Sequence, residues 1–359
     1  MPLDHYVTLG RSGLKVSPMC LGTLTFGEEG GYGAPPDVSK TLLDHYLDRG
    51  GNFIDTANYY SFGHAEKIIG DHLGQYPERR QRAVIATKFS TNCAPGDPNA
   101  GGANRKSIIK ACEDSLRRLQ TDYIDLYWQH FEDPFTPVDE TMQALNDLVR
   151  SGKVRYIGFS DSPAWRVAQA QVTASFRGWA PLIALQLEYS LLERSMEAEL
   201  VPAAKELGLG ITPFALLAEG LLTGKYQQAV DRNDVRGEMV SYRRSDRAAK
   251  VVQVVTDIAR ARETTSSRVA LAWVLAQPQI SSGIVGAKTT VQLEENLSAL
   301  ETRLTEDEIS QLNSVSIPRE NFSARTTRNM LPISYPDFTI NGQFIPKNRF
   351  SLSAGKKMQ

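Results

Sequence analysis

Eight short apolar runs alternate with amphipathic helical patterns along most of the chain. Almost every residue of each run is apolar, which is typical of parallel β-strands buried on both faces. A strand followed by a helix, repeated eight times, predicts an α/β protein with a (β/α)8 TIM barrel. The predicted strands are Met19–Thr23, Asn52–Ala57, Ala83–Lys88, Tyr123–His130, Val154–Ser160, Leu182–Tyr189, Gly210–Leu216 and Gly283–Ala287.

The segments between these runs carry apolar residues at helical spacing. Ahead of the first strand, apolar runs on either side of Gly10–Gly13 predict a β-hairpin. We expect this hairpin to close the N-terminal mouth of the barrel. The predicted helices are Val38–Arg49, Ala65–Leu73, Arg105–Leu119, Val138–Ser151, Ala164–Thr173, Glu197–Leu207, Arg247–Arg262, Ser266–Ala276 and Val291–Leu300.

The 359 residues are predicted to form one domain, residues 1–359, because α/β barrels commonly reach such lengths as single domains. The barrel is expected over about residues 19–318, followed by a C-terminal extension, 319–359. Ser90–Asn104, Leu217–Arg247 and everything after Pro318 break the alternation. We expect these long loops at the C-terminal face, where such a barrel builds its site.

The charges are nearly balanced, with 40 basic and 41 acidic residues. This balance gives no indication of nucleic acid or a membrane surface as a partner. No apolar run approaches the roughly 18 residues of a membrane helix. Cys20, Cys93 and Cys112 have no zinc or disulfide spacing, and Met1–Leu14 lacks the apolar core of a secretory signal. We therefore expect a cytoplasmic protein without a metal site.

Four chemically suited residues lie at the ends of three consecutive predicted strands: Asp55, Tyr60, Lys88 and His130. The carboxyl ends of barrel strands share one rim, so these side chains should converge. The Lys88 ammonium favours the phenolate form of Tyr60, and Asp55 is placed to pair with Lys88. His130 could orient a carbonyl oxygen or share the proton. The four groups together predict a proton donor for carbonyl reduction.

Each of these residues also has an ordinary structural explanation. A single strand-end lysine is often part of a surface salt bridge, and Asp55 before Thr56 could cap a turn. Four suitable groups on three consecutive strand ends make the functional interpretation the better one.

Three segments, read in order, carry a resemblance to a known family. Asp55–Tyr60 is Asp-Thr-Ala-Asn-Tyr-Tyr, Thr87–Lys88 ends a strand, and Asp125–His130 is Asp-Leu-Tyr-Trp-Gln-His. These segments resemble the motifs of the aldo-keto reductase superfamily, and the likeness extends over Tyr6–Pro318. The resemblance implies a (β/α)8 barrel that binds a nicotinamide cofactor.

The resemblance further implies that Asp55, Tyr60, Lys88 and His130 form a catalytic tetrad with Tyr60 as general acid. A hydride would pass from C4 of the reduced nicotinamide to the carbonyl carbon of an aldehyde or ketone. The expected cofactor is NADPH, with NADH as the alternative.

Segments further along the chain resemble those that hold this cofactor. Gly158–Asp161 and Gln186 resemble the segments that bind the nicotinamide carboxamide. Asp161 stands where the family more often has Asn, and an ionised carboxylate accepts hydrogen bonds but cannot donate them. Ser160 or Gln186 would then have to donate. Phe214 takes the place of an aromatic ring that stacks on the nicotinamide.

Gly286–Asn296 resembles the segment that binds the adenosine phosphate. A helix start offers free amides to a phosphate, and Lys288 adds a positive charge. Some relatives have Arg where Gln292 stands, so Lys288 is the one cation expected for a 2′-phosphate. The residues that the resemblance assigns to the cofactor are Gly22, Thr23, Leu24, Asp55, Ser160, Asp161, Gln186, Phe214, Ala215, Leu216, Gly220, Lys225, Gly286, Lys288, Gln292, Glu295 and Asn296.

Phe26, Tyr59, Trp128, Phe131 and Phe135 predict an aromatic, largely apolar mouth for a small carbonyl substrate. The identity of the substrate and the oligomeric state stay open.

Two other functions remain as alternatives. Potassium-channel β-subunits share this fold and most of these motifs, which makes a cofactor-binding regulatory subunit the second hypothesis. Some of those relatives lack the tetrad histidine, whereas His130 is present. A barrel isomerase or epimerase acting on a sugar without net redox change is the third.

Overall fold

The structure is a computed structural model that describes residues 2–31, 33–225 and 241–351. The chain falls into two compact units, Met1–Ile317 and Pro318–Gln359. The second unit begins one residue before the predicted C-terminal extension. Among the described residues, no helix combines the length and the apolar composition that crossing a membrane requires.

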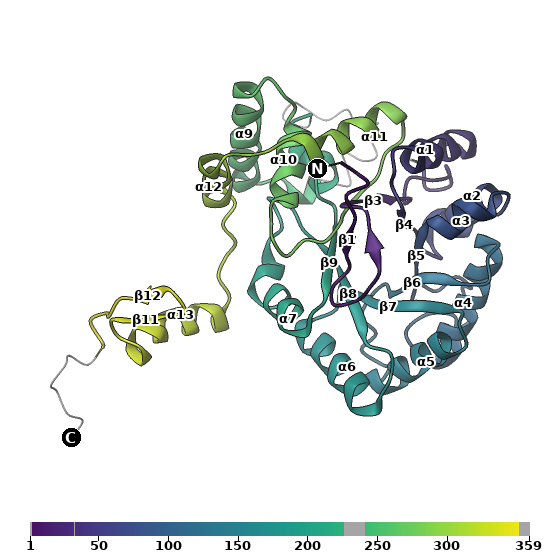
Figure 1. Cartoon of the computed structure of the whole chain (residues 1–359), viewed down its shortest axis with the longest axis horizontal. Helices are drawn as coiled ribbons and strands as arrows, with labels where there is room; N and C mark the ends of the chain where they lie inside the picture. Colours follow the sequence, from purple (N-terminus) through teal and green to yellow (C-terminus); the bar gives the residue numbers. More distant parts are fainter. Residues whose placement is uncertain (1, 32, 226–240, 352–359) are drawn as a thin grey trace. The chain divides into compact units, whose positions relative to one another are not determined.

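Eight parallel strands form the predicted barrel in the first unit, in the order β10-β3-β4-β5-β6-β7-β8-β9 (Figure 1). β3 and β10, the first and last barrel strands along the chain, pair with each other, and Cys20 lies beside Ile284. A bridge between Ile211 and Ile280 brings β9 toward β10 and nearly closes the sheet. The strands are β3 (Met19–Gly22), β4 (Phe53–Asp55), β5 (Val84–Phe89), β6 (Ile124–Gln129), β7 (Val154–Ser160), β8 (Leu182–Glu188), β9 (Gly210–Phe214) and β10 (Gly283–Val285).

Helices surround the strands and bury their apolar faces against the outside of the barrel (Figure 1). Two short helices, α3 (Pro77–Arg82) and α12 (Glu306–Val315), were not predicted. A capping box of Thr305 and Glu308 begins α12, a signal that the sequence does contain. The other helices of this unit are α1 (Pro36–Asp48), α2 (His64–Leu73), α4 (Arg105–Leu119), α5 (Val138–Arg150), α6 (Ala164–Arg177), α7 (Leu200–Leu207), α9 (Asp246–Ala261), α10 (Ser266–Leu275) and α11 (Thr290–Leu297).

The predicted hairpin, β1 (Val7–Thr8) and β2 (Lys15–Val16), covers the N-terminal end of the strands. Leu9 and Val16 are fully buried in the apolar cluster inside the barrel. Gly10 has φ +60°, and a Cβ there would lie 2.3 Å from the carbonyl oxygen of Ile183. The hairpin therefore approaches the strands closely enough that its turn requires glycine.

The C-terminal unit consists of α13 (Phe322–Ser334) and an antiparallel hairpin of β11 (Phe338–Ile340) and β12 (Gln343–Ile345). None of these elements was predicted. In this unit α13 buries no residue, and Ile345 is its buried apolar side chain within the described range. Phe338 and Phe344 on the hairpin are more than half exposed.

Candidate functional site

The strand ends bring the predicted tetrad together. Asp55 is the last residue of β4, and Lys88 lies near the end of β5. Tyr60 begins a 3-10 turn, η1 (Tyr60–Gly63), in the loop after β4, and His130 follows β6. Because the three strands are neighbours and parallel, all four residues lie at the C-terminal mouth of the barrel.

Lys88 is the centre of this arrangement. Its Nζ contacts a carboxylate oxygen of Asp55, donates to the backbone carbonyl of Thr56 at 2.8 Å and reaches Tyr60 Oη at 3.1 Å. These three partners match the three protons of an ammonium group. Lys88 is fully buried and Asp55 is 2% exposed. The ion pair is thus enclosed, and the geometry points one N–H of Lys88 at the phenol.

The charges of the pair support each other. Burial lowers the pKa of Lys88, but the Asp55 carboxylate and then Tyr60 raise it, and the net pKa lies above its ordinary value. Lys88 therefore keeps its positive charge at neutral pH despite complete burial.

His130 is uncharged in this site. Burial first, and the nearby Lys88 charge second, lower its pKa to about 2. Its ring stacks on Phe131 at 4.1 Å between centroids and meets the Tyr60 ring edge-on at 6.0 Å. Nδ1 is buried and, within the described part of the chain, has no hydrogen-bond partner. A neutral imidazole can bind a ligand through an unpaired ring nitrogen, which donates or accepts according to the tautomer.

Ser160 and Gln186 lie at the ends of β7 and β8, beside the tetrad. Gln186 Nε2 donates to Asp55 Oδ1 at 2.9 Å, so this amide helps to hold the tetrad carboxylate. Ser160 Oγ is buried and lacks a partner among the residues that the structure describes. Of the two predicted donors, Ser160 is the one whose hydroxyl remains available.

Asp161, the predicted departure from the family pattern, follows β7 with φ +42° and an exposed side chain. Partial desolvation first, and repulsion from Glu188 second, raise its pKa to about 6. Glu188 is compensated by Arg243, whose guanidinium lies 2.5 Å from Glu188 and 3.3 Å from Glu219. No local pattern in the sequence predicts this ion-pair network, because its members are distant in the chain.

The segment after β9 has an irregular backbone. Phe214 ends β9 half-buried, and Ala215 then adopts φ +53°. In the following 3-10 segment, η3 (Ala218–Thr223), Ala218, Glu219 and Gly220 all have positive φ. Successive amides in such a conformation can form a concave anion site. Leu216 is 2% exposed, and Lys225 is exposed beyond the segment.

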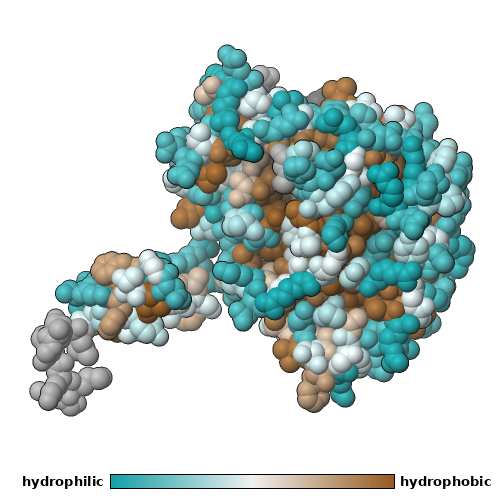
Figure 2. All heavy atoms as spheres, in the orientation of Figure 1, coloured by the Kyte–Doolittle hydropathy of each residue, from teal (hydrophilic) through white to brown (hydrophobic). Residues whose placement is uncertain are grey.

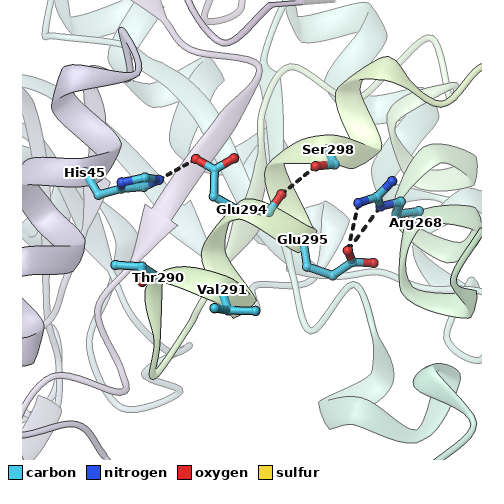
Figure 3. A pocket seen from close by; sticks show the side chains of 7 residues that line it. All are labelled: His45, Arg268, Thr290, Val291, Glu294, Glu295 and Ser298. Atoms are coloured by element: carbon cyan, nitrogen blue, oxygen red, sulfur yellow. Dashed lines mark hydrogen bonds and ion pairs between the residues drawn. The ribbon is translucent and has the colours of Figure 1, made fainter.

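The predicted adenosine segment borders an open cavity of about 430 Å³ (Figure 3). Glu294 pairs with His45, and Glu295 pairs with Arg268 at 2.9 Å. The cavity is lined by His45, Arg268, Thr290, Val291, Glu294, Glu295 and Ser298.

Two of the amides expected to be free at the start of α11 are already engaged. The amide of Lys288 donates to Gln292 Oε1 at 2.9 Å, and that of Gln292 donates to the hydroxyl of Thr289 at 3.2 Å. Asn296 is largely buried and donates to the carbonyl of Gly286 at 3.2 Å. These two amides and the Asn296 side chain thus form hydrogen bonds within the segment itself.

The first strand contributes backbone support at the same mouth. The amide and hydroxyl of Thr23 both donate to the carbonyl of Asp55, at 2.9 and 3.0 Å. Gly22 is paired beside Asp55, and Leu24 is 45% exposed.

A second pocket, of about 220 Å³, opens onto Tyr60. Tyr59, 47% exposed, and Phe62, 75% exposed, contribute aromatic rings to its wall. The described residues that line it are Leu24, Gly27, Gly30, Gly33, Tyr59, Tyr60, Ser61 and Phe62.

The predicted aromatic mouth is correct only in part. Tyr59, Phe131 and Phe135 are exposed, but Phe26 and Trp128 are fully buried. The Trp128 ring packs inside the barrel against Gly158, where a Cβ would lie 2.3 Å from it. Trp128 belongs to the core inside the barrel, because alternate strand residues point into it. Phe26 lies in the loop after β3 and packs in the larger apolar cluster.

Glu66 is a site-supporting residue that sequence reasoning missed. It is fully buried, accepts from the Thr87 hydroxyl at 2.5 Å and pairs with Arg118 at 2.6 Å. Thr87 precedes Lys88, so this contact anchors α2 and α4 to the strand that carries the tetrad lysine. An acidic residue in the first turn of a helix is ordinary, so only its burial distinguishes it.

Comparison with known proteins agrees with this geometry. The model of the Aldo/keto reductase family matches residues 18–317. The chain is 38% identical to an uncharacterized oxidoreductase of Bacillus subtilis, over 87% of this chain and 95% of that protein. It is 34% identical to an aryl-alcohol dehydrogenase of Pestalotiopsis microspora, over 86% of this chain and 81% of that protein. It is 32% identical to norsolorinic acid reductase of Aspergillus flavus, over 99% of this chain and 90% of that protein.

Proposed function

The chain belongs to the aldo/keto reductase family and is an NAD(P)H-dependent oxidoreductase, and on that premise we propose that it reduces aldehydes or ketones with NADPH, with Tyr60 as proton donor. The observation that carries this proposal is the contact of Lys88 Nζ with both Asp55 and Tyr60. A buried cation held in place by a carboxylate supports proton transfer by the phenol it touches.

In the proposed reduction, Tyr60 donates its hydroxyl proton to the carbonyl oxygen while the carbonyl carbon accepts a hydride. The Lys88 ammonium stabilises the phenolate that remains on Tyr60. Asp55, held by Gln186 at 2.9 Å, fixes Lys88 and compensates its charge. In alcohol oxidation the same phenolate takes the proton back.

His130 supplies orientation in this scheme. Because its pKa is about 2, the ring is neutral at physiological pH and does not act as the acid. Its unpaired nitrogen can instead share a hydrogen bond with the substrate oxygen at the position that Tyr60 serves.

The residues at the mouth fit a nicotinamide cofactor. The buried hydroxyl of Ser160 lacks a partner among the described residues, which leaves a hydrogen bond for a carboxamide. Phe214 could stack on the ring, the η3 backbone could hold the pyrophosphate, and Lys288 could bind a 2′-phosphate. When bound, NADPH supplies the hydride.

The substrate we propose is an aromatic or otherwise flat apolar carbonyl compound. The pocket at Tyr60 has walls formed by Tyr59 and Phe62, which favour stacking on flat rings. The names of two relatives, an aryl-alcohol dehydrogenase and norsolorinic acid reductase, support aromatic substrates.

A carbonyl panel assayed with NADPH and NADH side by side tests the proposal. We expect reduction of aromatic aldehydes, seen as loss of absorbance of the reduced nicotinamide, with NADPH preferred. Tight NADPH binding without turnover of any carbonyl would contradict the proposal and favour a regulatory subunit. Conversion of a sugar without net oxidation of cofactor would point instead to an isomerase.

A further inference from the structure

Asp161 lies close to the tetrad but is not part of it. Its backbone amide donates to the carbonyl of Gln186 at 3.1 Å, and the Gln186 side chain binds Asp55. Its carboxylate is exposed at the C-terminal mouth, directly after the buried Ser160. A group bound over these strand ends would therefore meet a carboxylate at this position.

The surrounding charges leave that carboxylate uncompensated. Lys88 on β5 and Glu188 on β8 are the charged groups that act on it, with opposite signs. Lys88 forms an ion pair with Asp55. Glu188 forms an ion pair with Arg243 in η4 (Ser241–Arg243), and Arg243 also pairs with Glu219. Within residues 2–31, 33–225 and 241–351, no ion pair includes Asp161.

Resting on the proposed function, we infer that Asp161 makes the site bind oxidised cofactor more tightly than a neutral residue there would. The nicotinamide ring is positively charged in NADP+ and neutral in NADPH. A carbonyl at Tyr60 requires the hydride donor over the same strand ends, so a carboxylate beside them attracts the charged ring selectively. The charge therefore shifts the bound equilibrium toward NADP+ and alcohol, the products of carbonyl reduction.

The ionisation of Asp161 supplies an internal check. Its pKa of about 6 means that the carboxylate is charged at neutral pH and protonated in mild acid. The preference for NADP+ should therefore weaken as the pH falls through about 6, since the charge that causes it is lost.

The test compares Asp161→Asn with the wild-type protein by measuring the dissociation constants of NADP+ and NADPH by fluorescence titration near pH 8. Asn keeps the shape and tolerates a positive φ, so the fold should be retained. We expect the Kd for NADP+ to rise about tenfold, while the Kd for NADPH changes less than about twofold. The matched control is Asp122→Asn, an exposed acid at the N-terminal end of β6, which should change neither constant.

The outcomes separate the two levels of the proposal. If NADP+ and NADPH both bind but their ratio is the same in Asp161→Asn and wild type, this inference is wrong and the proposed function stands. If neither form binds, the proposed function fails and the inference falls with it. A wild-type ratio that shows no change between about pH 5 and pH 8 would also overturn the inference.

Discussion

At the scale of single residues, the site depends on Lys88, whose ammonium group has a partner for each of its three protons. Lys88 is 0% exposed, and Asp55, Thr56 and Tyr60 take up its three protons. A buried ammonium with fixed partners cannot rotate away from the phenol, so its effect on Tyr60 is built into the fold.

Replacing Tyr60 by Phe should remove the proton donor and leave the ring in place. We expect the kcat for aldehyde reduction to fall at least about 100-fold, because a positioned general acid contributes on that order. The Kd for NADPH, measured by fluorescence, should stay within about twofold. A variant that reduces aldehydes at nearly the wild-type rate would exclude Tyr60 as the acid.

His130 should make the protein sensitive to acid. Its pKa is about 2 in the folded chain and 6.5 ordinarily, so below pH 6.5 the unfolded chain takes up a proton that the folded chain does not. The free energy of unfolding therefore does not depend on this histidine's protonation above pH 6.5. Below pH 6.5 it falls by about 1.4 kcal/mol per pH unit.

Urea unfolding of wild type and His130→Gln at several pH values between about 7 and 4 checks this expectation. The free energy of unfolding of the variant should depend less steeply on pH. His5→Gln, at an exposed histidine, is the control and should keep the wild-type slope. Equal slopes for wild type and His130→Gln would show that the pKa of His130 is the same in the folded and the unfolded chain.

At the scale of elements, the sequence predicted the strands better than the contacts between them. All eight strands lie where runs of apolar residues predicted them, because a parallel strand buried on both faces carries a continuous signal. Glu66 and Arg243 gave no such signal, since their burial depends on partners far along the chain.

The convergence of the four predicted residues at one mouth was predictable for a related reason. Asp55, Lys88 and His130 each sit within a few residues of a strand end, and the barrel brings consecutive strand ends together. The direction of the Gln186 side chain was not predictable, because its amide could reach either Asp55 or a ligand.

The N-terminal hairpin should be intolerant of a single methyl group. In Gly10→Ala the Cβ would meet the Ile183 carbonyl oxygen at 2.3 Å, and φ +60° is unfavourable for alanine. We expect the free energy of unfolding to drop by about 2 kcal/mol.

Gly13 in the same turn provides the matched control, because a Cβ there would meet no atom within 4 Å. Gly13→Ala should change the stability by less than about 0.5 kcal/mol. Equal effects of the two substitutions, measured by urea unfolding, would mean that the hairpin does not pack on the strands as described.

At the scale of the whole molecule, the apolar core lies within the first unit. Both clusters of buried apolar residues end at or before Leu312. A chain that ends at Ile317 should therefore fold, with a Tm within about 3 °C of the full chain.

A chain that ends at Leu304 is the control, since it also loses α12. That helix contains Leu312, which is fully buried. It also contains Asn313, whose Oδ1 accepts a hydrogen bond from the indole of Trp273 at 3.0 Å. Circular dichroism should show a much lower Tm for this shorter chain. A large loss of Tm on ending at Ile317 would show that the second unit is needed for stability.

The pairing of Cys20 with Ile284 sets the order in which this molecule can be completed. During synthesis β3 emerges early, yet one of its two edges finds no partner until nearly the whole barrel has left the ribosome. Contacts so distant in sequence form slowly, and an unpaired strand edge invites association with other chains. The nascent protein therefore passes through a long open stage, in which its dependence on chaperones should be greatest.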